Sequence, residues 1–207
     1  MRLAVTVGFD ADLVVRALAN INASEVFLLR GVTGSEGDAK SEATVRDVVR
    51  ALKRGVDYPV DLRDLTLGLR QIFQLSYDAV ALAGGPRLLV ILAFVASALK
   101  KARIYVVPEF SATPVDVTAL SYMADIGGLT KARLRVLAAL TREADADELA
   151  KALGLDTSTV YRHLSELEEK GLVKASGSRR KRYSADPLAV ALASMYLDAA
   201  DQDKAAE

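Results

Sequence analysis

The sequence contains no cysteine and a single histidine, His163. Without cysteine, the chain cannot form disulfide bonds, use thiolate catalysis or bind zinc through sulfur. One histidine also excludes a multi-histidine metal site and any catalytic scheme that needs two imidazoles. The single histidine could still serve in a catalytic triad. We expect no metal, no resident cofactor and no catalytic residues.

Long apolar runs are also absent. The longest spans residues 88–99, between Arg87 and the pair Lys100-Lys101, whereas a membrane-spanning helix needs about 20 apolar residues. We therefore expect this run to form a buried helix, with no membrane as a partner. No signal peptide or Arg-rich transit sequence precedes the first apolar run, so the expected location is cytoplasmic.

The chain has no net charge, because 27 basic residues balance 27 acidic residues. This excludes a histone-like polycation. The charges are unevenly spread, since residues 130–184 hold 12 basic and 8 acidic residues, while residues 185–207 hold 1 basic and 5 acidic. The excess positive charge therefore lies in one short stretch near the C-terminus. At 207 residues and 51% apolar, the chain can bury a core and is near the size at which one domain becomes two.

Short apolar runs alternate with helical patterns through the first half of the chain. The runs occupy residues 3–7, 25–29, 56–60, 79–83 and 104–107. Asp10 or Asp12, and later Asp61, are placed to cap helices, and Pro59 favours an edge position for the third strand. Strands separated by helices predict a parallel sheet with helices on both faces, which is an α/β, Rossmann-like domain.

The second half predicts a winged helix-turn-helix domain. Three helical patterns, the third capped by Asp156 or Thr157 and ended by Gly171, precede a hairpin at 172–184 and a last helix at 187–200. Gly127-Gly128 marks a break in regular structure. We therefore expect a first domain at 1–128, with a linker at 109–128 that holds one more strand near Val115, and a second domain at 129–207.

The third helix and the hairpin carry the residues that we expect to bind double-stranded DNA. Helices of this kind enter the major groove, where hydroxyls and arginine reach base edges. The exposed face of the helix consists of Thr157, Ser158, Thr159, Tyr161, Arg162 and Ser165. Cations on the hairpin suit phosphates, and they are Lys174, Arg179, Arg180, Lys181 and Arg182.

Some features of this half count against DNA binding. Glu166, Glu168 and Glu169 are expected at the far end of the helix, away from the groove. A structural or phosphate-facing role is expected for His163. The alternative is a helical protein-interaction module whose charge run is merely solvated, but no acidic residue interrupts residues 170–185, which favours DNA.

Two glycine-containing loops predict a ligand site in the first domain, because open α/β sheets bind ligands at the carboxyl ends of their strands. Gly8, Phe9 and Asp10 follow the first strand, and Gly84, Gly85, Pro86 and Arg87 follow the fourth. Free amides at a helix start and an arginine suit phosphate. A valine at Gly85 should then block approach of the ligand without unfolding the sheet. The alternative is an ordinary strand-to-helix turn.

No G-x-G-x-x-G or Walker A sequence is present, which disfavours dinucleotide redox chemistry. The order of the parts instead resembles the CARF-type transcription regulators of CRISPR–Cas systems, where CARF stands for CRISPR-associated Rossmann fold. G-F-D after the first strand, x-G-G-x-R after the fourth and the C-terminal winged helix carry this resemblance over nearly the whole chain.

The resemblance implies a homodimer of CARF domains that binds a cyclic oligoadenylate, commonly cyclic tetra-adenylate, across its interface through the two glycine loops. The second loop often begins with threonine in this family, but here Ala83 stands at that position. One hydroxyl contact would then be lost, or supplied instead by Thr33 or Ser35. The expected function is a transcription regulator that senses this ring and binds a promoter or CRISPR leader region.

Two alternative functions remain open. Some CARF proteins cleave the ring, for which Arg87 could stabilise the developing charge and Thr33 or Ser35 could orient the ring. The sequence identifies no general base for such a ring nuclease. A metabolite-responsive repressor unrelated to CRISPR would also fit, because two phosphate-suited loops could hold a mononucleotide.

Overall fold

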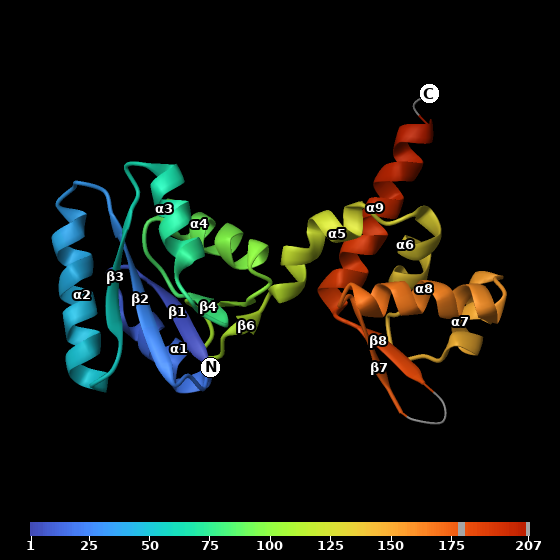
Figure 1. The fold of residues 1–207 in the computed structure, drawn as a ribbon, viewed down its shortest axis with the longest axis horizontal. Helices are drawn as coiled ribbons and strands as arrows, with labels where there is room; N and C mark the ends of the chain where they lie inside the picture. The colour runs from blue at the N-terminus through green and yellow to red at the C-terminus, as the bar shows by residue number, and fades with distance from the viewer. Residues whose placement is uncertain (178–180, 206–207) are drawn as a thin grey trace. The chain divides into compact units, whose positions relative to one another are not determined.

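The structure is a computed structural model that describes residues 1–177 and 181–205 (Figure 1). The chain divides into two compact units, Met1–Ser121 and Tyr122–Glu207. The division falls before the short helix α5 (Met123–Gly127), so the boundary expected after residue 128 lies one helix too late.

Packing within the second unit explains where α5 belongs. Ile126 is fully buried, and the Tyr196 hydroxyl of helix α9 (Pro187–Ala205) donates to the carbonyl oxygen of Met123 at 3.1 Å. Before α5, a single turn of 3₁₀ helix, η1 (Thr118–Tyr122), follows the last strand of the first unit.

The first unit is built on a six-stranded sheet with the order β3-β2-β1-β4-β5-β6. Its parallel strands are β1 (Arg2–Val7), β2 (Glu25–Val32), β3 (Val56–Asp61), β4 (Ala79–Leu82) and β5 (Arg103–Val106). The sixth strand, β6 (Val115–Asp116), pairs antiparallel with β5. The Rossmann-like parallel sheet is therefore confirmed, as is the edge position of the strand that contains Pro59.

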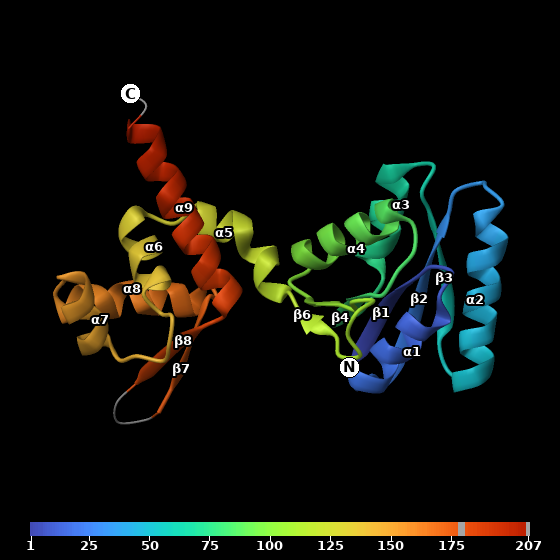
Figure 2. The same cartoon turned by 180° about the vertical axis from the view of Figure 1, so that it is seen from behind.

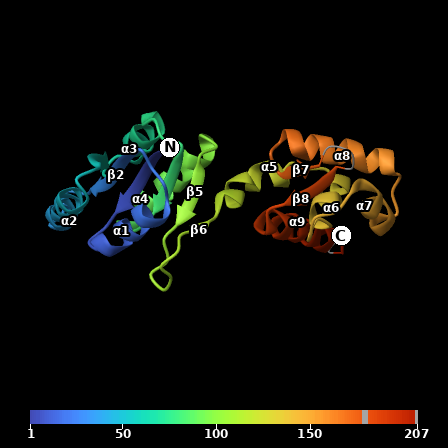
Figure 3. The ribbon, with the colours of Figure 1, turned by 90° about the horizontal axis from the view of Figure 1, so that it is seen from below.

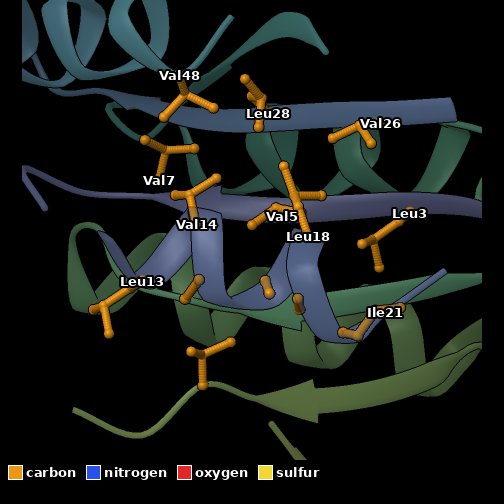
Figure 4. Close-up of a cluster of buried hydrophobic side chains, with 14 of the residues drawn as sticks. Leu3, Val5, Val7, Leu13, Val14, Leu18, Ile21, Val26, Leu28 and Val48 are labelled. Atoms are coloured by element: carbon orange, nitrogen blue, oxygen red, sulfur yellow. The ribbon is translucent and has the colours of Figure 1, made fainter. Parts of the chain in front are cut away.

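Helices cover both faces of this sheet, as Figure 3 shows. On one face lie α1 (Ala11–Asn20) and α2 (Gly37–Leu52), and on the other α3 (Leu65–Gln74) and α4 (Arg87–Leu99). Successive residues of a strand point to opposite faces, so Val5 and Val7 of β1 pack under α1, beside Val14 and Leu18 (Figure 4). Ala4 of the same strand joins the core beneath α3 and α4.

Two aspartates cap the helices of the first unit, and one of them is not the residue expected. Asp10 caps α1, where its carboxylate accepts from the backbone N–H of Asp12 at 2.8 Å. Helix α3 is capped by Asp64, which accepts from the N–H groups of Thr66 and Leu67 at 2.9 and 3.0 Å. Asp61 does not cap this helix, because β3 continues to that residue.

The loops after β1 and β4 touch at two glycines. A Cβ atom placed on Gly8 would lie 2.6 Å from the backbone nitrogen of Gly85, and one placed on Gly85 would lie 2.7 Å from the carbonyl oxygen of Val7. Gly85 also has φ +104°, a conformation that residues with a side chain rarely adopt. The expectation that a valine at Gly85 would act only on ligand binding is therefore wrong, because it would strain the fold.

The second unit is a winged helix-turn-helix, which confirms the expected fold (Figure 2). Its helices and wing strands are α6 (Lys131–Ala138), α7 (Ala146–Leu153), α8 (Thr157–Glu169), β7 (Val173–Ser176) and β8 (Arg182–Ala185). Helix α8 buries Val160, Leu164 and Leu167, the apolar face that its spacing predicted. The last helix, α9, packs against α6 and extends five residues beyond the expected end at 200. Across the part of the chain that the structure describes, no helix combines the length and apolarity that crossing a membrane requires.

His163 lies in the packing between α8 and α6, where it is only 8% exposed. Its Nδ1 atom has no hydrogen-bond partner among the described residues. Burial lowers the pKa of the imidazole, and the charges of Arg162 and Arg133 lower it further, while Glu166 opposes them. The neutral ring is therefore part of the packing of the domain.

We expect Gly85→Ala to lower the free energy of unfolding of the first unit by about 1–3 kcal/mol, because a side chain there meets both an unfavourable φ and the Val7 carbonyl. Gly34→Ala is the matched control. Gly34 also has a positive φ, of +80°, but its added Cβ would meet nothing nearer than the Arg63 side chain at 3.7 Å. Urea unfolding should show the larger loss for Gly85→Ala, and equal losses would contradict the contact between the loops.

We expect the second unit to lose stability as the pH falls through about 6.5, because the unfolded chain then binds a proton that folded His163 resists. This stability is fully present above the unfolded pKa and is lost as the pH falls toward the lowered folded pKa. His163→Leu removes this pH dependence, because leucine does not titrate. As the pH is lowered from about 8 to about 5.5, the melting temperature of the variant should therefore rise relative to that of the unmodified chain. A difference that stays constant would refute the role given to His163.

Candidate ligand-binding edge and nucleic-acid interface

The two glycine loops lie at the topological switch point of the sheet. The chain passes from β1 through α1 to β2 on one side, and from β4 through α4 to β5 on the other, while β1 and β4 are parallel neighbours. The loops at their carboxyl ends therefore meet at the edge where open α/β sheets bind ligands. A Cβ atom on Gly84 would lie 3.6 Å from the backbone nitrogen of Gly8, which shows how closely the loops approach.

Thr6 fixes the second loop and was not identified from the sequence. Its side chain is fully buried, and its hydroxyl oxygen accepts hydrogen bonds from the backbone N–H groups of Ala83 at 3.0 Å and Gly84 at 3.3 Å. The signal available in the sequence was one polar residue inside an otherwise apolar strand. The Thr6 hydroxyl therefore holds the loop in place through the backbone N–H groups of the loop.

The loop after β2 joins the same edge. A Cβ atom on Gly37 would lie 3.3 Å from the Phe9 ring and 3.4 Å from the Ser35 hydroxyl, and one on Gly31 would lie 3.1 Å from Pro86. The structure therefore brings the loops after β1, β2 and β4 together. Phe9 remains 67% exposed at this edge.

The hydroxyls of Thr33 and Ser35 are already hydrogen-bonded to each other, at 2.7 Å. The Thr33 hydroxyl also donates to the Asp38 carboxylate at 2.8 Å, and the N–H groups of Thr33 and Gly34 donate to the same carboxylate. These hydrogen bonds, that of the Thr33 hydroxyl first, lower the pKa of Asp38. A ligand contact by Thr33 or Ser35 would have to be shared with this network.

Arg63 is a second residue that sequence reasoning missed at this edge. Its Nε and Nη2 atoms donate to the two oxygens of Asp61 at 2.9 and 2.6 Å, and these hydrogen bonds lower the pKa of Asp61 to about 2. Its side chain lies beside Gly34 in the loop after β2. The charge of Arg63 is therefore largely balanced.

Arg87 differs from Arg63 because its charge is unbalanced. It is the first residue of α4, it is exposed, and it has no ion-pair or hydrogen-bond partner within residues 1–177 and 181–205. Free amides in the first turn of a helix carry partial positive charge. Arg87 and this turn together suit an anionic group, whereas Asp10 already serves as the cap of α1.

Helix α8 presents the polar face that was expected of it. Ser158, Tyr161, Arg162 and Ser165 are exposed, while Thr157 and Thr159 are half-buried. Thr157 is engaged within the domain, because its hydroxyl donates to the Asp147 carboxylate of α7 at 3.0 Å. Arg162 has no hydrogen-bond or ion-pair partner for its side chain in the part of the chain that is described, so its guanidinium is free.

The wing cations differ in how free they are. Lys174 is exposed and makes no ion pair with any described residue, whereas the Lys181 ammonium lies 3.7 Å from Glu168. Arg182 faces Glu143 and Glu148. Arg179 and Arg180 lie outside the described residues. Glu168, expected far from the groove, therefore faces a wing residue, and Glu166 forms an ion pair with Arg133 of α6.

Comparisons with known proteins match both units. The model of the Csa3 CRISPR-associated Rossmann-like domain matches residues 1–118, and that of the sugar-specific transcriptional regulator TrmB matches residues 123–189. The "CRISPR locus-related putative DNA-binding protein Csa3" of Thermoproteus tenax is 43% identical over 194 residues, which cover 93% of this chain and 95% of that protein.

Solved structures resemble only part of the chain. BpsR of Bordetella bronchiseptica, whose DNA binding is regulated by 6-hydroxynicotinic acid, is 24% identical with a TM-score of 0.35, over 42% of this chain and 72% of that chain. A MarR-family transcriptional regulator from Rhodococcus sp. RHA1 is 26% identical with a TM-score of 0.33, over 42% of this chain and 67% of that chain.

The family assignment rests on the family models and the sequence relative. The Rossmann-like model covers more than half of the chain, and the relative aligns with both units. The chain therefore belongs to the Csa3 family, in which a CRISPR-associated Rossmann-like domain precedes a TrmB-type winged-helix domain.

Proposed function

We propose that this chain is a dimeric transcription regulator that binds double-stranded DNA through its winged helix and a cyclic oligoadenylate through its CARF domain. The observation that carries the ligand half of the proposal is the meeting of the β1 and β4 loops at the switch point, beside an unpaired Arg87. The observation that carries the DNA half is the exposed polar face of α8 next to a basic wing.

The chemistry of the edge suits a phosphodiester with adenine bases. Arg87 and the first turn of α4 offer positive charge to phosphates, and glycines let a ligand approach the backbone. The exposed Phe9 ring offers a surface on which a base can stack. The resemblance to CARF regulators supplies the identity of the ligand, a cyclic oligoadenylate such as cyclic tetra-adenylate.

An apolar stripe on α4 supports the dimer. Ile91, Val95 and Leu99 follow one another at helical spacing and are 57%, 37% and 66% exposed, respectively. Exposed apolar patches of this kind mark interaction sites in soluble proteins. The same helix begins at Arg87, so a two-fold contact along it would bring two copies of the ligand edge toward a shared axis.

The winged-helix fold and the relative named for DNA binding support the DNA partner. They argue against a protein-interaction module, and membership of the Csa3 family argues against a regulator unrelated to CRISPR. Promoter or CRISPR leader DNA is the expected target, with Ser158, Arg162 and Ser165 toward the bases and the wing toward phosphates.

We also propose that the ring is bound without being cleaved. Cleavage would need a base that removes the proton of the attacking 2′-hydroxyl. Asp38, in the first turn of α2, and Asp61, the last residue of β3, have lowered pKa values because hydrogen bonds stabilise their charged forms. They are therefore weak bases, which favours binding over the ring-nuclease alternative.

Arg87→Ala should reduce the affinity for cyclic tetra-adenylate more than tenfold, because a charge-assisted contact contributes about 1.5–3 kcal/mol. Isothermal calorimetry measures this affinity and should give one ring for every two chains. Arg103→Ala is the matched control, since Arg103 is an exposed arginine at the amino end of β5, the opposite edge of the sheet. Equal affinities of the two variants would show that the ring binds elsewhere on the protein.

Two further readouts separate the parts of this proposal. Val95→Glu should produce monomers in light scattering and abolish ring binding, because each ring needs two chains. Chromatography of the bound ligand should recover the intact ring, and a linear product would favour the ring nuclease. A chain that binds no cyclic oligoadenylate would refute the ligand while leaving the DNA partner standing.

On DNA, Lys174→Gln should weaken binding to all duplexes alike and reduce the slope of log affinity against log salt by about 0.9, the value for one lost phosphate contact. Arg162→Ala should instead cost about 1–3 kcal/mol more on a duplex that the protein itself selects from a random pool than on unselected DNA. Fluorescence anisotropy at several salt concentrations measures both. Equal losses of Arg162→Ala on the two duplexes would exclude a base contact.

A further inference from the structure

Arg182 is held by three groups at the start of β8, where it pairs with Ser176 of β7. Its Nη2 atom donates to the carbonyl oxygen of Glu143 at 2.8 Å and lies 3.6 Å from the Glu148 carboxylate. Its Nε atom lies 3.8 Å from the Glu143 carboxylate. All these partners precede or begin α7, so the guanidinium links β8 of the wing to the start of the helix-turn-helix.

The acidic partners of Arg182 are themselves fixed. One oxygen of Glu148 accepts from the backbone N–H of Asp145 at 2.9 Å, as half of the capping box of α7. The Glu143 carboxylate accepts from the Ser176 hydroxyl of β7 at 2.8 Å. Glu143 therefore contacts both wing strands, and Glu148 connects them to the helix cap.

The next residue along β8 is anchored on the opposite side of the strand. Tyr183 is buried, and its backbone pairs with Ala144 through two hydrogen bonds of 2.8 and 3.0 Å. Its ring meets that of Tyr161 on α8 edge to face, with centroids 6.5 Å apart. Successive strand residues point to opposite faces, so β8 is fastened through both of its faces, one toward the α7 cap and one toward α8.

We propose that Arg182 positions the wing relative to the recognition helix α8 and does not bind a DNA phosphate, an inference that rests on the DNA-binding function proposed above. Its hydrogen bond to a carbonyl and its two carboxylate neighbours hold the guanidinium within the domain. Release to a phosphate would leave Glu143 and Glu148 uncompensated. The phosphates are then contacted by cations without such partners, of which Lys174 is one.

The test compares Arg182→Gln with Lys174→Gln in the full-length chain. The probe is a fluorescent duplex of random sequence, whose affinity is measured by anisotropy over a series of salt concentrations. If Arg182 only positions the wing, its loss should lower the affinity about tenfold while the salt slope stays at that of the unmodified chain. Lys174→Gln should reduce the slope by about 0.9. A reduced slope, or an unchanged affinity, for Arg182→Gln overturns the inference.

A double-mutant cycle distinguishes positioning from phosphate contact by a second route. In the Glu143→Gln/Glu148→Gln background both carboxylates are gone and only the hydrogen bond to the backbone carbonyl of residue 143 remains, so adding Arg182→Gln should lower the affinity clearly less than it does in the unmodified chain. A phosphate contact would instead cost as much in that background as in the unmodified chain, which would overturn the inference.

Two controls keep the result interpretable. Arg182→Lys retains the charge but not the planar fork, so it should recover only part of the affinity, and full recovery would overturn the positioning role. Circular dichroism at the assay temperature should show every variant folded. Failure of the unmodified chain to bind any duplex would overturn the DNA-binding function and this inference together, whereas a lowered slope in Arg182→Gln alone overturns only the inference.

Discussion

The contact between Gly8 and Gly85 is the constraint on which the first domain depends. Two loops that begin on neighbouring parallel strands can meet only if neither carries a side chain at the point of contact, because a Cβ atom on either would lie under 3 Å from backbone atoms. The buried Thr6 hydroxyl holds the second loop in place for this contact. Phe9 and Arg87, both exposed, follow these loops at the carboxyl edge of the sheet, which is where the fold class binds ligands.

The corresponding constraint in the second domain is electrostatic. Glu143, Glu148 and Glu168 lie close to the wing, so two of its cations, Lys181 and Arg182, face carboxylates of the same chain. Half-exposed ion pairs contribute little to stability individually. Their consequence here is geometric, because an arginine that is hydrogen-bonded to a carbonyl and flanked by two carboxylates stays where the domain places it.

Most of the fold was predicted because the buried apolar residues of helices and strands occur in regular patterns along the sequence. Uninterrupted apolar runs predicted the strands of the sheet, and the spacing of Val160, Leu164 and Leu167 predicted which face of α8 is buried. The cap of α3 was missed because Asp61 and Asp64 both precede the helix, and the length of β3 decides between them. Contacts between loops that are distant in the chain produce no such pattern of residues.

The candidate site was less predictable than the fold, for the same reason. The two glycine loops could be placed at one edge from topology alone, but the roles of Thr6 and Arg63 depend on contacts with other loops. Arg182 belonged to a run without any acidic residue, and yet Glu143, its hydrogen-bond partner, lies 39 positions earlier in the chain. Local charge patterns therefore identify a basic wing without saying which of its cations are free.

Electrostatics also connects the two proposed partners of the chain. A chain of zero net charge has no long-range attraction to DNA beyond what one face supplies. With Arg182 and Lys181 both near carboxylates, Lys174 is the one cation among the described residues of each wing that has no ion pair. Dimerisation doubles the number of such cations without changing the net charge. Because the affinity of a basic surface depends steeply on the number of phosphates it contacts, the proposed ring across two CARF domains would act on the same dimer that would bind DNA more tightly than one chain.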